Sequence, residues 1–516
     1  MGREEEEEEE EGGKGLVSKK AEKKEAVKAE KAMRRRQHEG GSFAHASRSS
    51  EADPLAEKYG EMPLSYAQSK EVTGWRWTEV ESLVEELKGE EVLIRGWVQT
   101  IRAVGKNTAF LVLRSLGYTV QCVVAVAPEL VSRQMVKFAA GLNKESVVDV
   151  QGVVTVPFLP IKSTTQEVEV QVRKIFCISK AVPNLPFNIE DAARSEKEIK
   201  EAKLAGETLV SVGQDIRLNN RVLDLRTPAN LRISDIKSQI SIVRDYDFGL
   251  TIHRAFAIIA ISWSFPTKAF HFDWIEMLVL FLSSEGFVMI HTPKIIASSS
   301  EGGSTVFEVN YLGQRACLAQ SPQLHTQMTI CAGLRRVFES GAVCRAEDSY
   351  TRRHLCQFAG LDVEMEIKEH YFEYLRKTLK LTFQEGVQML KEAGIEVDPL
   401  GDLNTESERK LGQLVLEKFS STIVVKLVPD FVLLDLGEEI ISGGQRIHDP
   451  DFLTARAEAS GIDVKKISAY IDAFRYGAPP HGGFGAGLER LVMLFCALNN
   501  IRKTSLYPRD PRRLVP

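Results

Sequence analysis

The chain has 516 residues, of which 43% are apolar and 27% are charged, and its formal net charge is −5. This length exceeds one ordinary domain, so we expect two or three domains in a soluble globular protein. The seven cysteines are scattered and form no CxxC pair, which argues against a disulfide framework or a zinc site. The N-terminus is charged and carries no secretory signal, so we expect a cytoplasmic protein without a membrane partner.

Residues 1–74 begin with an acidic run from Glu4 to Glu11, which predicts disorder. Residues 17–37 combine alanines with long charged side chains, and this composition favours a helix. Lys20, Lys24 and Lys28 lie along one face of that predicted helix. Two interpretations stay open: a solvated helix, or a basic helix that binds RNA phosphates without reading sequence.

Residues 75–180 change to a period of two. Five strand-like segments lie at 91–100, 109–115, 118–126, 146–156 and 167–179, and a helical stretch at 128–142 follows the third. This order is that of an OB-fold, a small barrel that commonly binds single-stranded nucleic acid. Phe110, at the start of the second segment, either fills the barrel or stacks on a base, and the residues alone favour the core.

Residues 181–228 are mostly polar and predict a hinge, and residues 229–516 predict one α+β region. The stretch 255–282 within that region is strongly apolar, but a proline and several charged residues interrupt it. Neither half approaches the roughly 20 apolar residues of a membrane span, so we expect no span here.

The stretch GAVCRAEDSYTRRHLCQFAGLDVEME, residues 341–366, alternates apolar residues with charges of both signs. A spacing of two predicts that Arg345 and Glu347 share one face of a strand, and likewise Asp362 and Glu364. A structural ion pair needs fewer charges than these, and the guanidinium fork suits phosphate or carboxylate oxygens. We therefore expect this stretch to bind a ligand that carries such groups.

Four further stretches add weaker signals. SEGG at 300–303 and QSPQ at 320–323 are, taken alone, ordinary turn sequences. In LGEEIISGGQRIHD, Glu439 precedes Ser442 and Arg446, a mixture of hard oxygen ligands and a cation that would suit a Mg²⁺–nucleotide site. GGFGAG at 482–487 can bring backbone close to a nucleotide, but without the GxGxxG pattern and a βαβ context it disfavours a Rossmann site.

Together these residues resemble a known family. The residues RAEDS, RRHL and GLDVEME look like motif 2 of the class II aminoacyl-tRNA synthetases, GFGAGLERLVM looks like motif 3, and FVMIHTPKI resembles the strand of motif 1. QSPQ, SEGG, SGGQRIHD and the terminal PRDPRRL resemble the eukaryotic cytosolic aspartyl-tRNA synthetases, most nearly those of plants. The resemblance covers most of the chain from Ser18 onward.

The resemblance implies an antiparallel catalytic sheet flanked by helices, an OB-fold that reads the anticodon, a homodimer, and association with other synthetases. It also implies a two-step reaction with Mg²⁺. The α-carboxylate of L-aspartate attacks the α-phosphorus of ATP, and tRNA(Asp) then takes the aspartyl group from the adenylate. Such chemistry needs positioning and charge stabilisation rather than a protein nucleophile.

The resemblance assigns roles residue by residue. Catalysis would rest on Arg345, Glu439 and Arg490. Aspartate would be bound by Glu301, Gln323, Arg345, Asp362, Glu364, Ser442 and Arg446. ATP would be bound by Arg345, Glu347, Arg353, His354, Leu355, Glu439, Ser442, Gly487, Leu488, Glu489 and Arg490, with Mg²⁺ on Glu439 and Ser442. tRNA would contact Phe110, Gln121, Glu169, Lys20, Lys24 and Lys28, which shifts both open interpretations above toward function.

The sequence departs from the family pattern at two positions and in two segments. Thr326 stands where the family has a lysine that helps hold the substrate's side-chain carboxylate, and Val432 where it has a Mg²⁺-binding aspartate. Asp430 has the strand parity to substitute for that aspartate, and Asp435 does not. The segments 245–275 and 370–436 are atypical. Two alternatives to an aspartate–tRNA ligase therefore stay open: a catalytically inactive tRNA-binding relative, and an asparagine-specific relative.

Overall fold

The computed structural model describes residues 53–63, 76–161, 163–234, 279–297, 299–300, 305–368, 379–397, 405–419, 423–426, 430–435, 438–496 and 498–515. The chain divides into two compact units, Met1–Ala56 and Glu57–Pro516, and the description below concerns the second. Lys20, Lys24, Lys28, Glu301 and most of the apolar stretch at 255–282 lie outside the described residues. In the part of the chain that is described, no helix is long and apolar enough to cross a membrane.

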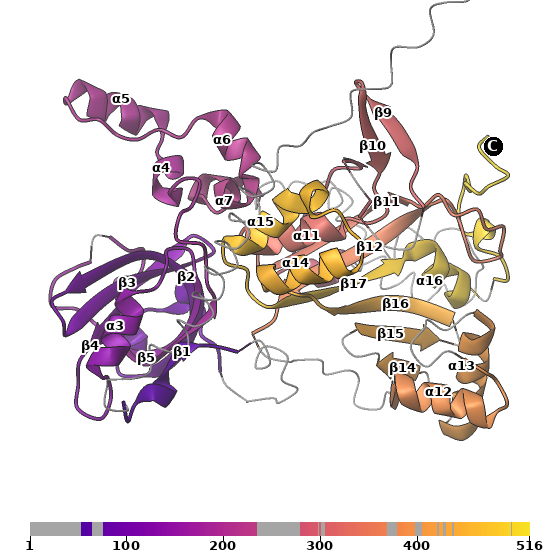
Figure 1. Cartoon of the computed structure of the whole chain (residues 1–516), viewed down its shortest axis with the longest axis horizontal. Helices are drawn as coiled ribbons and strands as arrows, with labels where there is room; N and C mark the ends of the chain where they lie inside the picture. The colour runs from indigo at the N-terminus through magenta and orange to yellow at the C-terminus, as the bar shows by residue number, and fades with distance from the viewer. Residues whose placement is uncertain are drawn as a thin grey trace, which may run out of the picture. The chain divides into compact units, whose positions relative to one another are not determined.

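The predicted OB-fold is present (Figure 1). Its strands are β2 (Glu91–Val104), β3 (Thr108–Ser115), β4 (Tyr118–Ala125), β5 (Val147–Thr155) and β6 (Glu169–Ser179). β2 pairs with both β3 and β5, β4 pairs with β3 and β6, and β5 pairs with β6, so the sheet closes on itself. A short strand, β1 (Tyr59–Glu61), adds to β6. The helix between β4 and β5, α3 (Arg133–Ala140), begins later than predicted because the side chain of Ser132 caps it.

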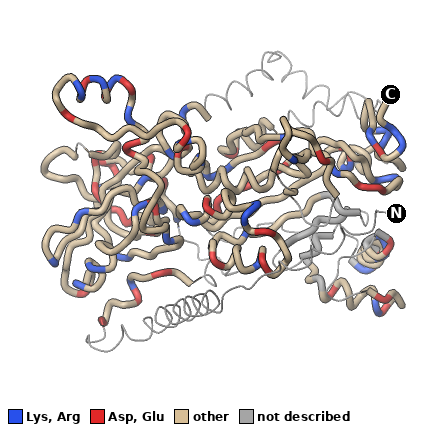
Figure 2. The backbone as a smooth tube through the Cα atoms, turned by 45° about the horizontal axis from the view of Figure 1, so that its top comes forward, with Lys and Arg blue, Asp and Glu red and all other residues tan. Residues whose placement is uncertain are grey.

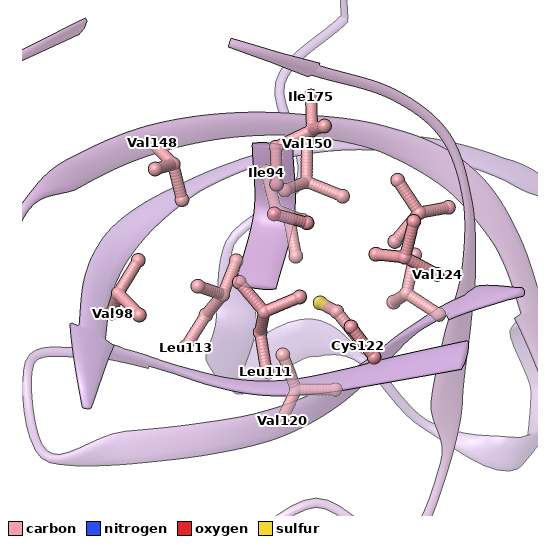
Figure 3. Close-up of a cluster of buried hydrophobic side chains, with 14 of the residues drawn as sticks. Ile94, Val98, Leu111, Leu113, Val120, Cys122, Val124, Val148, Val150 and Ile175 are labelled. Atoms are coloured by element: carbon pink, nitrogen blue, oxygen red, sulfur yellow. The ribbon is translucent and has the colours of Figure 1, made fainter. Parts of the chain in front are cut away.

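Apolar side chains at alternate positions fill the barrel (Figure 3). Ile94, Leu111, Leu113 and Val150 are each 0% exposed, and burying such a side chain contributes about 1.5–3 kcal/mol. Because successive side chains of a strand point to opposite faces, the burial of Leu111 places Phe110 on the outside of the barrel.

Residues 181–228, predicted as a polar hinge, contain four short helices in their described length: α4 (Ile189–Ala193), α5 (Glu196–Leu204), α6 (Gln214–Asn219) and α7 (Arg221–Leu225). The end of this segment is buried rather than polar and exposed. Arg226 is 1% exposed and donates hydrogen bonds to the carbonyls of Cys331 and Gly477 and to the carboxylate of Glu145. These contacts tie the segment to the barrel and to the α+β region that follows it.

The predicted α+β region, residues 229–516, is built on a second sheet in its described part (Figure 1). Among the described residues its strand order is β13-β14-β15-β16-β17-β12-β11-β7. The bounds are β7 (Val288–Met289), β11 (Arg336–Cys344), β12 (Gln357–Glu366), β13 (Leu379–Thr382), β14 (Ile423–Lys426), β15 (Asp430–Asp435), β16 (Glu438–Gln445) and β17 (His481–Gly487). The central pairs are antiparallel, as predicted, and only the outer pairs β13–β14 and β11–β7 are parallel among these strands. Three strands, β8 (Ile295–Ile296), β9 (Glu308–Tyr311) and β10 (Gln314–Leu318), form a separate small sheet in the described part.

Helices cover both faces of the large sheet. On one face α16 (Leu488–Phe495) packs on a core that includes Phe338, Leu361 and Val363. On the opposite face α11 (Gln323–Cys331), α14 (Pro450–Ala459) and α15 (Ser468–Arg475) pack together around Phe474. Two more helices, α12 (Phe383–Glu392) and α13 (Thr405–Phe419), pack on each other beside β13. The prediction of an α+β region is confirmed.

Candidate functional site

Three glycines on β17 form the floor of the candidate site. Gly483, Gly485 and Gly487 alternate along the strand, so they occupy one face of the sheet. Gly485 pairs with Asp362 of β12 on one side and with Ser442 of β16 on the other. The pairing therefore brings together residues that lie 80 positions apart in the sequence.

The glycines leave the space that two carboxylates use. A Cβ atom at Gly483 would lie 2.1 Å from the carbonyl oxygen of Val363 and 2.5 Å from Oε2 of Glu364. A Cβ atom at Gly485 would lie 3.1 Å from Oδ1 of Asp362. The carboxylates of Asp362 and Glu364 thus lie over the same face of the sheet, as their spacing predicts.

Glu364 and Arg446 form a buried ion pair on this face. Nε and Nη2 of Arg446 lie 3.2 and 3.4 Å from the two carboxylate oxygens of Glu364. Glu364 is 1% exposed, and burial raises its pKa to about 7 against the opposing effect of Arg446. The carboxyl group can therefore take up a proton near neutral pH beside a guanidinium that suits a substrate carboxylate.

A register shift brings Glu439 and Ser442 to the same face of β16. Val432 pairs with Ser442, and Leu434 pairs with Glu439. The two β15 residues are two positions apart whereas the two β16 residues are three apart, so the irregularity between the pairs puts Glu439 and Ser442 on one face. Asp430 lies two positions from Val432 on β15, which confirms its predicted parity. Among the described residues, no group of three or more His, Cys, Asp or Glu side chains gathers as a metal site would.

Arg345 and Glu347 do not lie on a strand, and this part of the prediction is wrong. The pairing of β11 with β12 ends at Cys344, and residues 345–356 form the loop between these strands, which we name the motif 2 loop. Arg345 continues the ladder by one bond, from its amide to the carbonyl of Cys356 at 2.9 Å, before the chain turns away. Its Nε donates to the carbonyl of Gln320 at 3.4 Å.

Phe358 is a site residue that the sequence reasoning missed. The guanidinium carbon of Arg345 lies 5.5 Å from the centre of its ring, and a Cβ atom at Gly487 would touch the same ring at 3.8 Å. Phe358 shares its strand parity with Asp362 and Glu364. Extending the alternation of β12 toward its start would have found it.

The motif 2 loop gathers the cationic residues around His354. Nδ1 of His354 lies 2.7 Å from Oγ1 of Thr351, and Nε2 lies 3.9 Å from the Glu347 carboxylate. Burial lowers the pKa of His354, and so do the positive charges of Arg490, Arg353 and Arg345, whereas Glu347 acts in the opposite direction. Three predicted ATP ligands therefore lie close enough to act on one imidazole, which makes the region suitable for phosphate.

Three other residues predicted to bind ATP are used in packing and in a backbone hydrogen bond beside the site. Leu488 and Leu355 are 5% and 4% exposed, and Leu355 packs against Met493. The carboxylate of Glu489 accepts the amide of Ala359 at 3.0 and 3.1 Å. These side chains are used inside the protein, so they act on the candidate site through the backbone they hold in place.

Helix α11 carries the predicted Gln323 at its first position. Thr326 is 1% exposed, and its hydroxyl donates to the carbonyl of Gln323 at 2.9 Å, so it offers no charge to a ligand. Gln327, which the sequence reasoning missed, accepts a hydrogen bond from Tyr470 and lies 3.3 Å from Nε2 of His481. Burial lowers the pKa of His481 to about 3, so this polar cluster is neutral there.

The three predicted tRNA residues of the barrel lie together on its outer face. Gln121 pairs with Glu169 across β4 and β6, and its amide donates to that carboxylate at 2.6 Å. Phe110 is half-buried and lies outside the apolar interior, so the core interpretation for it is wrong. Arg102, which the sequence reasoning missed, places its guanidinium carbon 5.0 Å from the centre of the Phe110 ring.

Known proteins match this chain in both of its domains. Residues 270–412 and 416–511 match the family described as tRNA synthetases class II (D, K and N), and residues 92–178 match the family described as OB-fold nucleic acid binding domain. Aspartate–tRNA ligase 1, cytoplasmic, from Arabidopsis thaliana is 48% identical, with 97% of this chain and 98% of the relative covered. The second such ligase of that plant is 49% identical over 90% of each chain, and the one from Bos taurus is 41% identical over 92% and 99%.

Proposed function

The chain belongs to the class II aminoacyl-tRNA synthetases, among those of the aspartyl type, and on this premise we propose that it is a cytoplasmic aspartate–tRNA ligase. In the first step the α-carboxylate of L-aspartate attacks the α-phosphorus of ATP, and pyrophosphate leaves. In the second step the terminal ribose hydroxyl of tRNA(Asp) attacks the aspartyl carbonyl of the adenylate, and AMP leaves.

The observation that supports the proposal best is the shared face of β12, β17 and β16. It places the Asp362 carboxylate and the Glu364–Arg446 pair over a floor of glycines. In this proposal Arg446 binds the side-chain carboxylate of aspartate, and Gln323 and Asp362 contact its ammonium and α-carboxylate. The family resemblance assigns the same role to Glu301, which lies outside the described residues. Glu364 sets the orientation of Arg446.

In this proposal the ATP phosphates bind among the arginines of the motif 2 loop and α16. Arg345, Arg353 and Arg490 all act electrostatically on His354, so they can share the charge of one triphosphate. Arg345 stabilises the charge that develops on the α-phosphoryl oxygens. Phe358 and the backbone at Gly487 offer a flat apolar contact for adenine, with Glu347 at its edge.

Mg²⁺ enters in this proposal with ATP. Mg²⁺ is usually bound by one or two carboxylates together with substrate phosphates, and Glu439 and Ser442, on one face of β16, offer a donor set of hard oxygens that fits this pattern. When bound, the ion would neutralise charge on the phosphate oxygens.

In this proposal the barrel binds the anticodon of tRNA(Asp). Phe110, with Arg102 beside it, offers a ring on which a base can stack. Gln121 and Glu169 offer hydrogen-bonding groups next to it. The lysines of the N-terminal extension, Lys20, Lys24 and Lys28, add contacts to RNA phosphates that do not depend on sequence.

We propose that the protein acts as a homodimer. The support for this is the family resemblance, in which motif 1 builds the dimer interface, and β7 is the described strand of motif 1. The mass of the purified protein in solution tests this directly. Association with other synthetases stays a prediction of the family resemblance.

Aspartate-dependent exchange of labelled pyrophosphate into ATP tests the proposed activity. Purified wild-type protein with Mg²⁺ should catalyse exchange with L-aspartate and much less with L-asparagine. Absence of exchange together with retained tRNA binding would overturn the proposal in favour of an inactive tRNA-binding relative. Exchange that depends on asparagine would favour the asparagine-specific relative.

A further inference from the structure

The last residues of the chain pack against the motif 2 loop. We name residues 498–515 the C-terminal segment; it contains a short 3-10 helix, η6 (Ile501–Lys503). The amide of Ile501 donates to the carbonyl of Arg352 at 2.8 Å. Nη1 of Arg502 donates to the carbonyl of Thr351 at 2.7 Å. The backbone at the turn of the loop is therefore bound to the end of the chain.

A chain of backbone hydrogen bonds connects the same segment to Arg345. The amide of Arg345 donates to the carbonyl of Cys356 at 2.9 Å, and the amide of Cys356 donates to the carbonyl of Arg509 at 2.8 Å. Gln357 and Arg509 form an antiparallel bridge at the same place. The second arm of the loop is thus bound through its backbone to Arg509 of the C-terminal segment.

Apolar contacts reinforce these hydrogen bonds. Leu355 of the loop, Met493 of α16 and Ile501 form one buried cluster, at 4%, 0% and 4% exposure. Phe358, which lies under the Arg345 guanidinium, packs against the same cluster. A displacement of the C-terminal segment would therefore release both the backbone and the apolar support of the loop.

Asp510 organises the C-terminal segment. It is the only acidic residue among five basic ones between positions 498 and 515. Figure 2 shows Lys and Arg, in blue, near the C-terminus. The side chain of Asp510 is 0% exposed, and its carboxylate lies 2.5 Å from Nε of Arg502 and accepts the amide of Arg512 at 2.8 Å. The guanidinium carbons of Arg502 and Arg512 each lie 4.2 Å from the ring centre of Tyr350, in the motif 2 loop. One carboxylate thus binds the guanidinium of Arg502 and the backbone of Arg512, the two arginines that contact this tyrosine.

We propose that the C-terminal segment is a positioning element of the ATP site, in which Asp510 and Arg502 hold the motif 2 loop in the conformation that binds the triphosphate. This inference rests on the proposed function. The segment touches the loop and α16, whereas the carboxylate-rich face of β12 and β17 is held by other contacts. Its effect is therefore larger for ATP than for aspartate, which shares only Arg345 with the motif 2 loop.

The variants Asp510→Asn and Arg502→Lys test the proposal. Asp510→Asn keeps the shape of the side chain and removes its charge, and Arg502→Lys keeps the charge and removes the fork that reaches both Asp510 and Thr351. A truncation after Arg513 is the matched control, because Leu514 and Val515 are 83% and 72% exposed. Each protein is assayed for pyrophosphate exchange, for thermal unfolding, and for ATP binding by equilibrium dialysis without aspartate.

For Asp510→Asn we expect KM for ATP to rise roughly tenfold, which corresponds to about 1.4 kcal/mol, with KM for aspartate within about twofold of wild type. The truncation should behave as wild type. Equal changes in both KM values, a loss of kcat that only follows a lowered Tm, or unchanged ATP binding would overturn the proposal. If Asp510→Asn fails to fold, Arg502→Lys carries the same comparison.

The dialysis separates this inference from the proposed function. Wild-type protein that binds ATP without supporting aspartate-dependent exchange would contradict the ligase activity alone. Weaker ATP binding by Asp510→Asn in that case would still support the role of the C-terminal segment, and equal binding by both proteins would overturn it.

Discussion

Replacing Gly483 with alanine tests the close approach of β12 and β17 under the candidate site. The new Cβ atom would lie 2.1 Å from the carbonyl oxygen of Val363 and 2.5 Å from the Glu364 carboxylate. A carbonyl on the neighbouring strand cannot rotate away, so the two strands must separate. We expect a loss of about 3 kcal/mol in the free energy of unfolding, at the upper end of the range for overpacked sites. Part of the loss comes from weaker contact between Glu364 and Arg446.

Gly485→Ala is the matched control for this prediction. Its Cβ atom would meet only Oδ1 of Asp362, at 3.1 Å, and that end of a side chain can move. The cost in stability should be about 1 kcal/mol or less, while KM for aspartate rises because Asp362 is displaced. Thermal unfolding and pyrophosphate exchange measure both effects. If Gly483→Ala melts at the temperature of wild type, or if the two variants lose equal stability, the reasoning from the strand spacing is refuted.

Three further predictions follow from single contacts. Because burial raises the pKa of Glu364 to about 7, the folded state binds that proton more tightly than the unfolded chain does. The protonated carboxyl therefore adds fully to the free energy of unfolding below the ordinary carboxyl pKa, and this stabilisation is lost as the pH rises to about 7. The free energy of unfolding of the wild type should fall by up to about 3 kcal/mol from this cause as the pH rises, and Glu364→Gln should not show this fall. Denaturant unfolding of both proteins at pH 5 and pH 8 measures the difference. Arg226→Met leaves Glu145 and several buried carbonyls with fewer partners and should cost about 3–5 kcal/mol; a Tm unchanged from wild type would contradict it. Phe110→Ala should weaken tRNA binding by about 1–3 kcal/mol and leave tRNA-independent pyrophosphate exchange unchanged; equal losses in both assays would refute a role in the barrel alone.

Local sequence patterns predict much of the fold. The period of two in residues 91–179 predicts each barrel strand, because one face of every strand is buried and the other is not. The same rule predicts that Asp362 and Glu364 share a face. It fails at Arg345, because the ladder ends at Cys344 and the direction of the chain after a strand depends on contacts that a period does not encode.

Features that depend on distant parts of the chain were not predictable from local patterns. The partners of Arg226 lie 81 to 251 positions away in sequence, so its polar neighbourhood predicts an exposed hinge although the residue is buried. Glycines 483 and 485 lie under the carboxylates of Glu364 and Asp362 only because β17 pairs with β12, which is more than a hundred positions away in sequence. The register shift in β16 that aligns Glu439 with Ser442 likewise depends on its pairing with β15.

The most direct test of the account is the identity of the amino acid that the protein attaches to tRNA. Purified protein is incubated with ATP, Mg²⁺, tRNA(Asp) and equal concentrations of aspartate and asparagine, and the charged tRNA is analysed by mass spectrometry. The account predicts aspartyl-tRNA as the product. Asparaginyl-tRNA, or bound tRNA that stays uncharged, would contradict it.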